Sequence, residues 1–167
     1  MPKAPRLTAK QASLLRADLA QSGWGVESVE ALLGPVAAAA LQRELRAPAL
    51  RVVRRALAAG AGDAAGYKVA VLTALFMLGE PVGAAALETA LPRTGVAGAL
   101  AIGLVVPTQS ASGEQLYAPA VDLRPHEAED AHGSVRWWVA SDLGELVTDQ
   151  ALAPDHVLGI GRAGLTL

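Results

Sequence analysis

The chain lacks cysteine and is poor in aromatic residues and long apolar runs. Its 167 residues include no cysteine, which excludes disulfides, thiolate metal sites and cysteine nucleophiles. No apolar run reaches the ~20 residues that span a bilayer. The basic residues at the N-terminus are not followed by the apolar stretch of a signal peptide. We therefore expect a cytoplasmic protein that does not associate with a membrane.

Charge is distributed unevenly along the chain, although the net charge is only −2. Residues 1–60 contain nine Lys or Arg and four Asp or Glu, whereas residues 61–167 contain five and twelve. A basic half beside an acidic half can indicate a surface that faces a polyanion. It can also arise from helices whose solvated faces are rich in arginine. Composition leaves both interpretations open.

Helical spacing dominates the first 60 residues. Thr8 followed by Gln11 predicts a capping box at the start of a first helix. Gly34 and Pro35 predict the end of a second helix over 26–33 and the start of a third, because proline at the first helical position loses no hydrogen bond. A fourth helix follows Pro48 and directs arginines outward, and the glycines of 58–66 predict a joint after it.

The next segment changes from helices to strands. Helical spacing covers 69–78, 83–91 and 94–102, with Thr94 as the expected N-cap of the last helix. Strands are predicted over 104–106, 115–124 and 136–141, separated by a polar turn over 109–114 and a charged loop over 127–134. Three helices followed by a hairpin are the order of a winged helix.

We therefore predict an α+β fold, in which N-terminal helices precede a winged-helix-like unit with a small three-stranded antiparallel sheet. The predicted organisation is a helical region over 1–60, a winged-helix-like domain over 67–150 and a linker over 151–167.

Three local patterns suggest chemistry but lack its context. Residues 159–164 match G-x-G-x-x-G, yet too few residues follow for the helix that a dinucleotide site needs. His126 and His132 have no recognised metal-ligand spacing, so no metal site is predicted. Ser141, Asp142 and His156 lack the Gly-x-Ser-x-Gly elbow of a serine hydrolase. A solvated acidic loop and a strand end explain these residues more simply.

Arginines and tryptophans supply two binding hypotheses. Arg51, Arg54 and Arg55 suit phosphate, because the planar guanidinium donates parallel hydrogen bonds. They would serve a free-standing winged-helix nucleic-acid-binding protein, the alternative to the function inferred below. The helix over 94–102 has little that reaches base edges, which favours packing or protein contact. Trp137 and Trp138 point to opposite faces of a strand, so one could anchor a partner.

Four segments in the second half carry a family resemblance. They are residues 121–126 (VDLRPH), 137–143 (WWVASDL), 154–161 (PDHVLGIG) and 165–167 (LTL), in that order, and residues 72–81 add to the pattern. This pattern resembles the N-terminal region of bacterial class I S-adenosylmethionine-dependent methyltransferases, related to the protein-glutamine and "small domain" methyltransferases. The resemblance covers about 67–167, and Arg162 and Gly164 depart from it.

The resemblance implies an auxiliary or substrate-recognition role. It implies that Asp155, His156, Gly159, Gly161 and Thr166 lie near the cofactor in an intact enzyme. The glycine-rich cofactor motif and the Asn-Pro-Pro-Tyr catalytic motif would follow Leu167, so this chain holds no catalytic residue and no cofactor of its own. S-adenosylmethionine is expected for the intact enzyme. The implied partners are a catalytic domain in cis and a methyl acceptor, either protein or nucleic acid.

Overall fold

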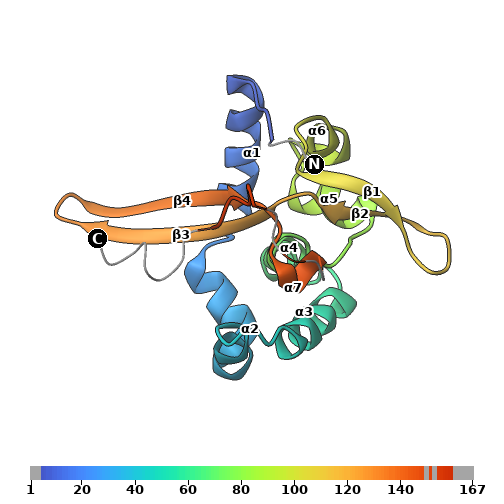
Figure 1. Cartoon of the computed structure of the whole chain (residues 1–167), viewed down its shortest axis with the longest axis horizontal. Coiled ribbons are helices and arrows are strands. Elements are labelled where there is room, and N and C mark those ends of the chain that lie inside the picture. The colour runs from blue at the N-terminus through green and yellow to red at the C-terminus, as the bar shows by residue number, and fades with distance from the viewer. Residues whose placement is uncertain (1–4, 149–150, 152–153, 160–167) are drawn as a thin grey trace.

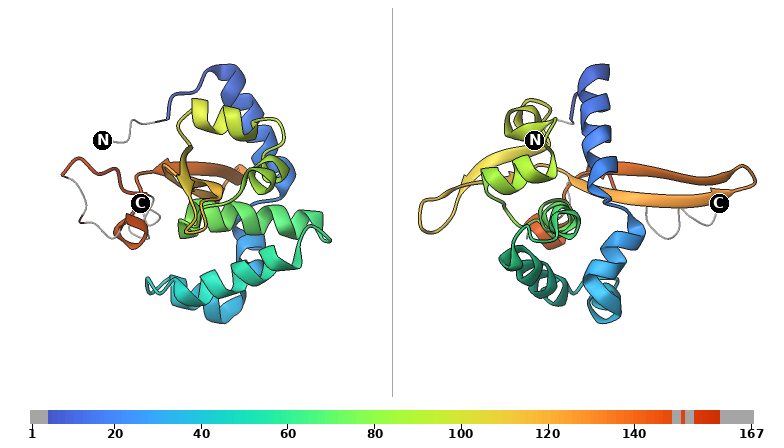
Figure 2. Two further views of the ribbon diagram at one scale, coloured as in Figure 1. Left: turned by 90° about the vertical axis from the view of Figure 1, so that its right-hand side faces the viewer. Right: turned by 180° about the vertical axis from the view of Figure 1, so that it is seen from behind.

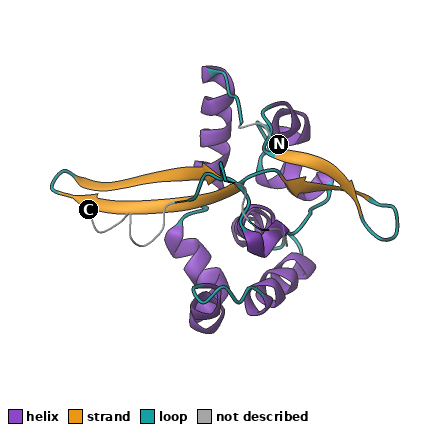
Figure 3. Cartoon of the chain, viewed as in Figure 1, coloured by secondary structure: helices purple, strands orange, loops and turns teal. Residues whose placement is uncertain are grey.

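The computed structural model describes residues 5–148, 151 and 154–159. Helices and antiparallel strands are mixed along these residues, which confirms the α+β class (Figure 3). The helices are α1 (Ala9–Ser22), α2 (Val26–Leu41), α3 (Ala47–Ala59), α4 (Ala64–Leu72), the π-helical segment η1 (Thr73–Met77), α5 (Ala84–Ala90), α6 (Gly95–Ala101) and α7 (Glu145–Thr148). The strands are β1 (Val105–Gln109), β2 (Gln115–Pro119), β3 (Asp122–Asp130) and β4 (Gly133–Ser141).

Local sequence signals set the ends of the first helices, as predicted. The Thr8 hydroxyl accepts a hydrogen bond from the Gln11 backbone N–H, and the Gln11 side chain accepts one from the Thr8 backbone N–H. Within α2, Gly34 has φ of 70° and ψ of 169°, which breaks the helix before Pro35. The left-handed φ favours glycine, because a Cβ there would meet the backbone.

A central helix formed by α4 and η1 organises the core. It contacts α1, α2, α3 and α5 and lies at the centre of the helices in both views of Figure 2. Seven of its residues are completely buried: Ala70, Val71, Leu72, Thr73, Ala74, Leu75 and Phe76. The helix ends where the helical spacing over 69–78 predicts, since Gly79 follows with a φ of 71°.

The strands form two separate hairpins, which differs from the predicted arrangement. β1 pairs with β2 and β3 pairs with β4, each pair antiparallel, and the two hairpins extend in opposite directions (Figure 1). The predicted strand over 136–141 therefore pairs with β3, not with the first hairpin. The predicted strand over 115–124 is divided at Ala120, whose N–H donates to the Leu104 carbonyl at 2.9 Å.

The predicted charged loop over 127–134 is wrong. Residues 127–130 continue β3 and residues 133–134 begin β4, with Glu127 opposite Arg136 and Asp130 opposite Gly133. These residues are mostly exposed, because the distal half of the hairpin extends beyond the helices. The high polarity that suggested a loop reflects a strand pair with little core to cover. Backbone pairing, which does not depend on side-chain polarity, maintains the strands.

One hydrophobic cluster joins the two sides of the predicted joint. It includes Leu19 and Val53 before the joint, and Leu72, Leu87 and Leu123 after it. α3 ends at Ala59 and α4 begins at Ala64, so the joint is a short exposed turn around Gly60. The helices of 1–60 thus share their core with the segment that follows.

None of the helices in the described part of the chain is by itself long and apolar enough to cross a membrane. α1 and α2 together meet the length and composition test, but they are bent by 48° relative to each other.

Candidate functional site

A pocket of about 330 Å³ lies where the polypeptide after β4 returns to the helices. We call it the junction pocket. Segments far apart in sequence line it. The lining residues include Glu44, Arg46, Met77, Asp122, Arg124 and His156. The end of α2, η1, β3 and the segment after β4 thus meet at this one place.

Two charged side chains of β3 are locked together in the junction pocket. Arg124 donates from Nε to Asp122 Oδ1 at 2.7 Å and from Nη2 to Asp122 Oδ2 at 2.8 Å. The hydrogen bonds and charge of Asp122 raise the pKa of Arg124 despite its desolvation. A bidentate pair of this kind fixes the plane of the guanidinium. Arg46 is also engaged, since its Nη1 donates to the Leu78 carbonyl at 2.9 Å.

A backbone feature marks the same pocket. Glu44 has a φ of 63° and is the single non-glycine residue with positive φ in the described part of the chain. Such a conformation costs of order 1 kcal/mol and persists where surrounding contacts hold it. The Glu44 N–H donates to the Leu41 carbonyl and the Leu45 N–H donates to the Ala40 carbonyl, and α2 ends at Leu41.

The segment over 154–159 is held against the end of β4. The Val157 N–H donates to Asp142 Oδ2 at 2.9 Å, and the Asp142 N–H donates to the Val157 carbonyl at 3.1 Å. His156 is half-buried and lines the junction pocket, whereas Asp155 is exposed. Gly159 lies against Ser141, whose Oγ would be 3.1 Å from an added Cβ. Of the residues that the family resemblance implies, Gly161 and Thr166 lie outside the described residues.

The buried carboxylate of the junction pocket is already engaged within the protein. The buried carboxylate of the pocket, Asp122, already accepts both hydrogen bonds of Arg124. We therefore assign no chemical step to these residues.

His126 lies two residues after Arg124 on β3, and its pKa is lowered. Desolvation and the charge of Arg124 lower the pKa of His126 below its ordinary value of 6.5, and Asp122 partly offsets this. A lowered pKa in the folded state means that the unfolded chain binds a proton more readily. The stability contributed by neutral His126 is therefore present above pH 6.5 and is lost as pH falls through the folded pKa.

A variant at His126 tests this linkage. We expect His126→Gln to lose less stability than the parent protein when pH falls from about 8 to about 5, since glutamine does not titrate. Urea unfolding at both pH values measures the difference. Equal losses in the two proteins would contradict the assignment.

The predicted basic cluster is exposed on α3 but partly neutralised. Arg51, Arg54 and Arg55 all face solvent, as predicted. Arg54 makes a bidentate contact with Glu80, with N–O distances of 2.9–3.0 Å. Arg51 and Arg55 have no hydrogen-bond or ion-pair partner among the described residues. Within the described part of the chain, the cluster therefore offers two unpaired cations, Arg51 and Arg55, on α3.

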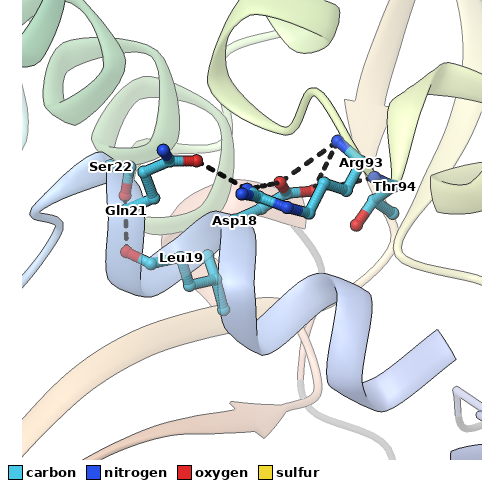
Figure 4. A network of polar contacts seen from close by, with 6 residues as sticks. All are labelled: Asp18, Leu19, Gln21, Ser22, Arg93 and Thr94. Atoms are coloured by element: carbon cyan, nitrogen blue, oxygen red, sulfur yellow. Dashed lines mark hydrogen bonds and ion pairs between the residues drawn. The ribbon is translucent and has the colours of Figure 1, made fainter. Parts of the chain in front are cut away.

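The capping role expected of the Thr94 side chain at α6 is taken by Glu88 of α5, whose Oε1 accepts from the Val96 N–H at 2.9 Å, and a carboxylate from α1 binds the N–H groups just before the helix. Thr94 makes no side-chain cap hydrogen bond. The buried Asp18 accepts from the Thr94 N–H at 2.7 Å and from the Arg93 N–H at 3.1 Å (Figure 4). The Arg93 guanidinium also donates to Asp18 at 3.2 Å and to Gln21 at 2.5 Å. Arg93 is thus held by α1, and α6 itself carries no basic side chain.

The tryptophans divide into packed and less packed positions. Trp24 is 1% exposed, its Nε1 donates to Thr73 Oγ1 at 3.1 Å, and its ring centroid lies 6.2 Å from that of Phe76. Trp138 packs against the core and donates from Nε1 to the Trp24 carbonyl at 3.0 Å. Trp137 is half-buried and its indole N–H has no partner among the described residues. Trp137 and Trp138 are successive residues of β4, so their side chains lie on opposite faces of the strand, as expected.

The remaining chemical candidates do not assemble. No group of three or more His, Asp or Glu in the described part of the chain could hold a metal ion. Asp142 is bonded to the Val157 N–H, and no hydrogen bond joins Ser141, Asp142 and His156 within the described residues. The G-x-G-x-x-G segment is described only at Gly159.

Asp18 is the residue that sequence reasoning missed. A signal for it exists, because Asp18 shares the buried face of α1 with Leu15, Leu19 and Ser22. A carboxylate on an apolar helical face needs a partner when it is buried. The identity of that partner, 75 residues away, is not visible in the sequence.

Comparisons with known proteins place the chain in a family without naming an activity. No curated protein matches the sequence, and no solved structure does. One family model, described as a domain of unknown function (DUF7059), matches residues 21–116. The matched segment runs from the end of α1 into β2 and includes α6, but it ends before β3 and β4. Because it covers more than half of the chain, this protein belongs to the DUF7059 family.

Proposed function

We propose that this chain is the auxiliary, substrate-recognition region of an S-adenosylmethionine-dependent methyltransferase and precedes its catalytic domain. The chain contributes recognition and positioning, and the cofactor and the reacting atoms belong to the domain that follows.

The observation that carries the proposal is the convergence of the resembling segments. Asp122 and Arg124 come from residues 121–126, Gly144 follows residues 137–143, and His156 comes from residues 154–161. Two of these segments thus line one pocket, and the third ends one residue before Gly144, which also lines it. Two hydrogen bonds between Asp142 and Val157, one of them to the Asp142 carboxylate, hold the last of these segments in place. A shared pattern that gathers at one junction supports a common role there.

The arrangement of the middle of the chain supports a winged-helix-like unit. The central helix, α5 and α6 are followed by the β1–β2 hairpin. Val82 lies between the central helix and α5, and it exchanges both backbone hydrogen bonds with Tyr117 of β2, at 2.8 and 3.0 Å. This bridge occupies the place that the third strand of a winged-helix sheet would take. We infer that Val82, β2 and β1 are the sheet of this unit.

The charges argue that this unit does not read DNA. Reading a major groove needs donors and acceptors that reach base edges, and phosphate contact needs Lys or Arg. α6 consists of Gly, Val, Ala and Leu, and the adjacent Arg93 is bound by Asp18 and Gln21. These observations favour a unit used for packing and recognition of another surface.

Binding of S-adenosylmethionine tests the proposal. We expect calorimetry to give no binding to this chain and clear binding to the product of its complete reading frame. In that longer protein, Arg124→Gln should lower methyl transfer by about tenfold, which corresponds to about 1.4 kcal/mol of lost stabilisation. Arg51→Gln, the same substitution on α3, should leave the rate unchanged and serves as the control.

Two results would overturn the proposal. Micromolar binding of S-adenosylmethionine to this chain alone would show that it holds a cofactor site. A complete reading frame whose product does not bind S-adenosylmethionine would remove the catalytic domain that the proposal requires.

A further inference from the structure

A groove of about 480 Å³ runs between α1 and β4, away from the junction pocket. We call it the α1–β4 groove. Figure 1 shows α1 standing across the base of the β3–β4 hairpin. Alternate residues of a strand face one side, so Arg136, Trp138 and Ala140 point toward the same face of the hairpin. Its volume is in the range of about 300–1,000 Å³ that binding pockets occupy.

The lining of the groove is aliphatic on α1 and aromatic on β4, where Trp137 and Trp138 both contribute. Leu15 and Leu19 of α1 are among the lining residues and belong to the core cluster. The Trp138 ring is fixed by the hydrogen bond from its Nε1 to the Trp24 carbonyl. A preformed apolar groove pays little ordering cost when a partner enters.

The rim of the groove is positive. Arg16 and Arg136 are the ionisable residues that line it, and no carboxylate does so among the described residues. Arg16 is exposed, and the Arg136 side chain is 70% exposed. Arg136 contacts Glu127 at 3.3 Å, and an exposed ion pair of this kind is weak, of about 0–1 kcal/mol. The groove therefore combines an apolar interior with two accessible guanidinium groups.

We propose that the α1–β4 groove binds an acidic amphipathic peptide segment of a partner protein. Its apolar side chains would enter between α1 and β4, and its carboxylates would meet Arg16 and Arg136. This is the helix-in-groove mode of recognition, with charge complementarity at the rim. The inference concerns peptide binding alone and goes beyond the proposed function.

The lining favours a peptide over an unstacked nucleobase. A base edge carries several hydrogen-bonding groups, and burying them without partners is costly. No Asn, Gln, Ser or Thr lines the groove in the described part of the chain. The Trp138 indole N–H is already bonded, so among the described lining residues the Trp137 indole N–H is the one uncharged side-chain donor without a partner. Aliphatic side chains of a peptide need no such partners.

Fluorescence anisotropy tests the proposal with two labelled peptides of about 16 residues, long enough for a helix to be marginally stable. Both carry leucines at helical spacing, and their remaining positions are glutamate in one and lysine in the other. We expect the glutamate peptide to bind and the lysine peptide not to bind. Arg16→Glu/Arg136→Glu should weaken binding of the glutamate peptide by at least about tenfold.

Two further variants separate charge from shape. Arg51→Glu/Arg55→Glu makes the same charge change on α3, outside the groove, and should leave peptide affinity unchanged. Ala140→Trp fills the groove from an exposed position and should abolish binding without changing charge. Circular dichroism confirms that each variant is folded.

Other occupants are distinguished in the same assay. Absence of binding by the glutamate peptide, or equal binding by the two peptides, would overturn the proposal. So would an oligothymidylate that binds in a manner sensitive to Arg16→Glu/Arg136→Glu while the glutamate peptide does not bind. A dimer detected by sedimentation and lost in that variant would assign the groove to a second copy of the chain, and would equally overturn it.

Discussion

Trp24→Ala should lower the free energy of unfolding by about 3–5 kcal/mol, the usual cost of deleting a large aromatic side chain from a core. Trp24 is 1% exposed and packs against Phe76. Its removal also leaves the completely buried Thr73 hydroxyl without the indole donor. Since small domains are stable by about 5–15 kcal/mol, the variant should be partly unfolded or close to it. Urea unfolding followed by circular dichroism measures the loss.

Trp137→Ala is the matched control for that experiment. Trp137 is half-buried, lies outside the core cluster and has no hydrogen-bond partner among the described residues. We expect its replacement to cost about 1 kcal/mol or less. Trp24→Phe should fall between the two, because it keeps most of the packing and loses the hydrogen bond to Thr73. Equal effects of the two alanine variants would mean that Trp24 does not anchor the core.

Asp18→Ala should destabilise the protein by about 3 kcal/mol, because it leaves two backbone N–H groups without their acceptor. Asp18 is 1% exposed, and its carboxylate accepts from two backbone N–H groups and the Arg93 guanidinium. Without it, the N–H groups before α6 remain unsatisfied in a part-buried position. Chemical denaturation of the purified variant measures the change.

Two variants isolate what Asp18 contributes. Asp63→Ala makes the same substitution at an exposed position that forms no side-chain cap, and should change stability by less than about 0.5 kcal/mol. Arg93→Gln leaves both backbone hydrogen bonds to Asp18 intact and should cost less than Asp18→Ala. If Arg93→Gln proved the more damaging, the exposed guanidinium and not the backbone hydrogen bonds would hold α6 to α1.

The limits of prediction differ between helices and strands. The break at Gly34–Pro35 and the stop at Gly79 were predictable, because proline and a left-handed glycine act on the backbone within one or two residues. The polar run over 127–134 was misinterpreted, because β pairing is decided by the partner strand. The 9-residue strands β3 and β4 are paired along their whole length, regardless of the charge of their outer half.

The candidate sites were predictable to the same extent: local features were foreseen, and contacts between distant residues were not. His156 was singled out by resemblance and lines the junction pocket, but Glu44 and Arg46, which also line it, come from the turn between α2 and α3, more than 100 residues earlier. The arginines of α3 were correctly placed on the surface, yet the pairing of Arg54 with Glu80 requires the contact between α3 and the end of the central helix.

By itself, the sequence determined the mixed α+β class, the positions of most helices and the solvated arginine face of α3. Each of these depends on periodicity or on residues that act locally on φ, ψ or a free N–H group. Only the tertiary structure decided that Asp18 binds the N–H groups before α6, that the strands form two hairpins, and that β3 and the segment over 154–159 meet at one pocket. Those features depend on pairs distant in sequence, and distant contacts are fixed only when burial of a common core brings their elements together.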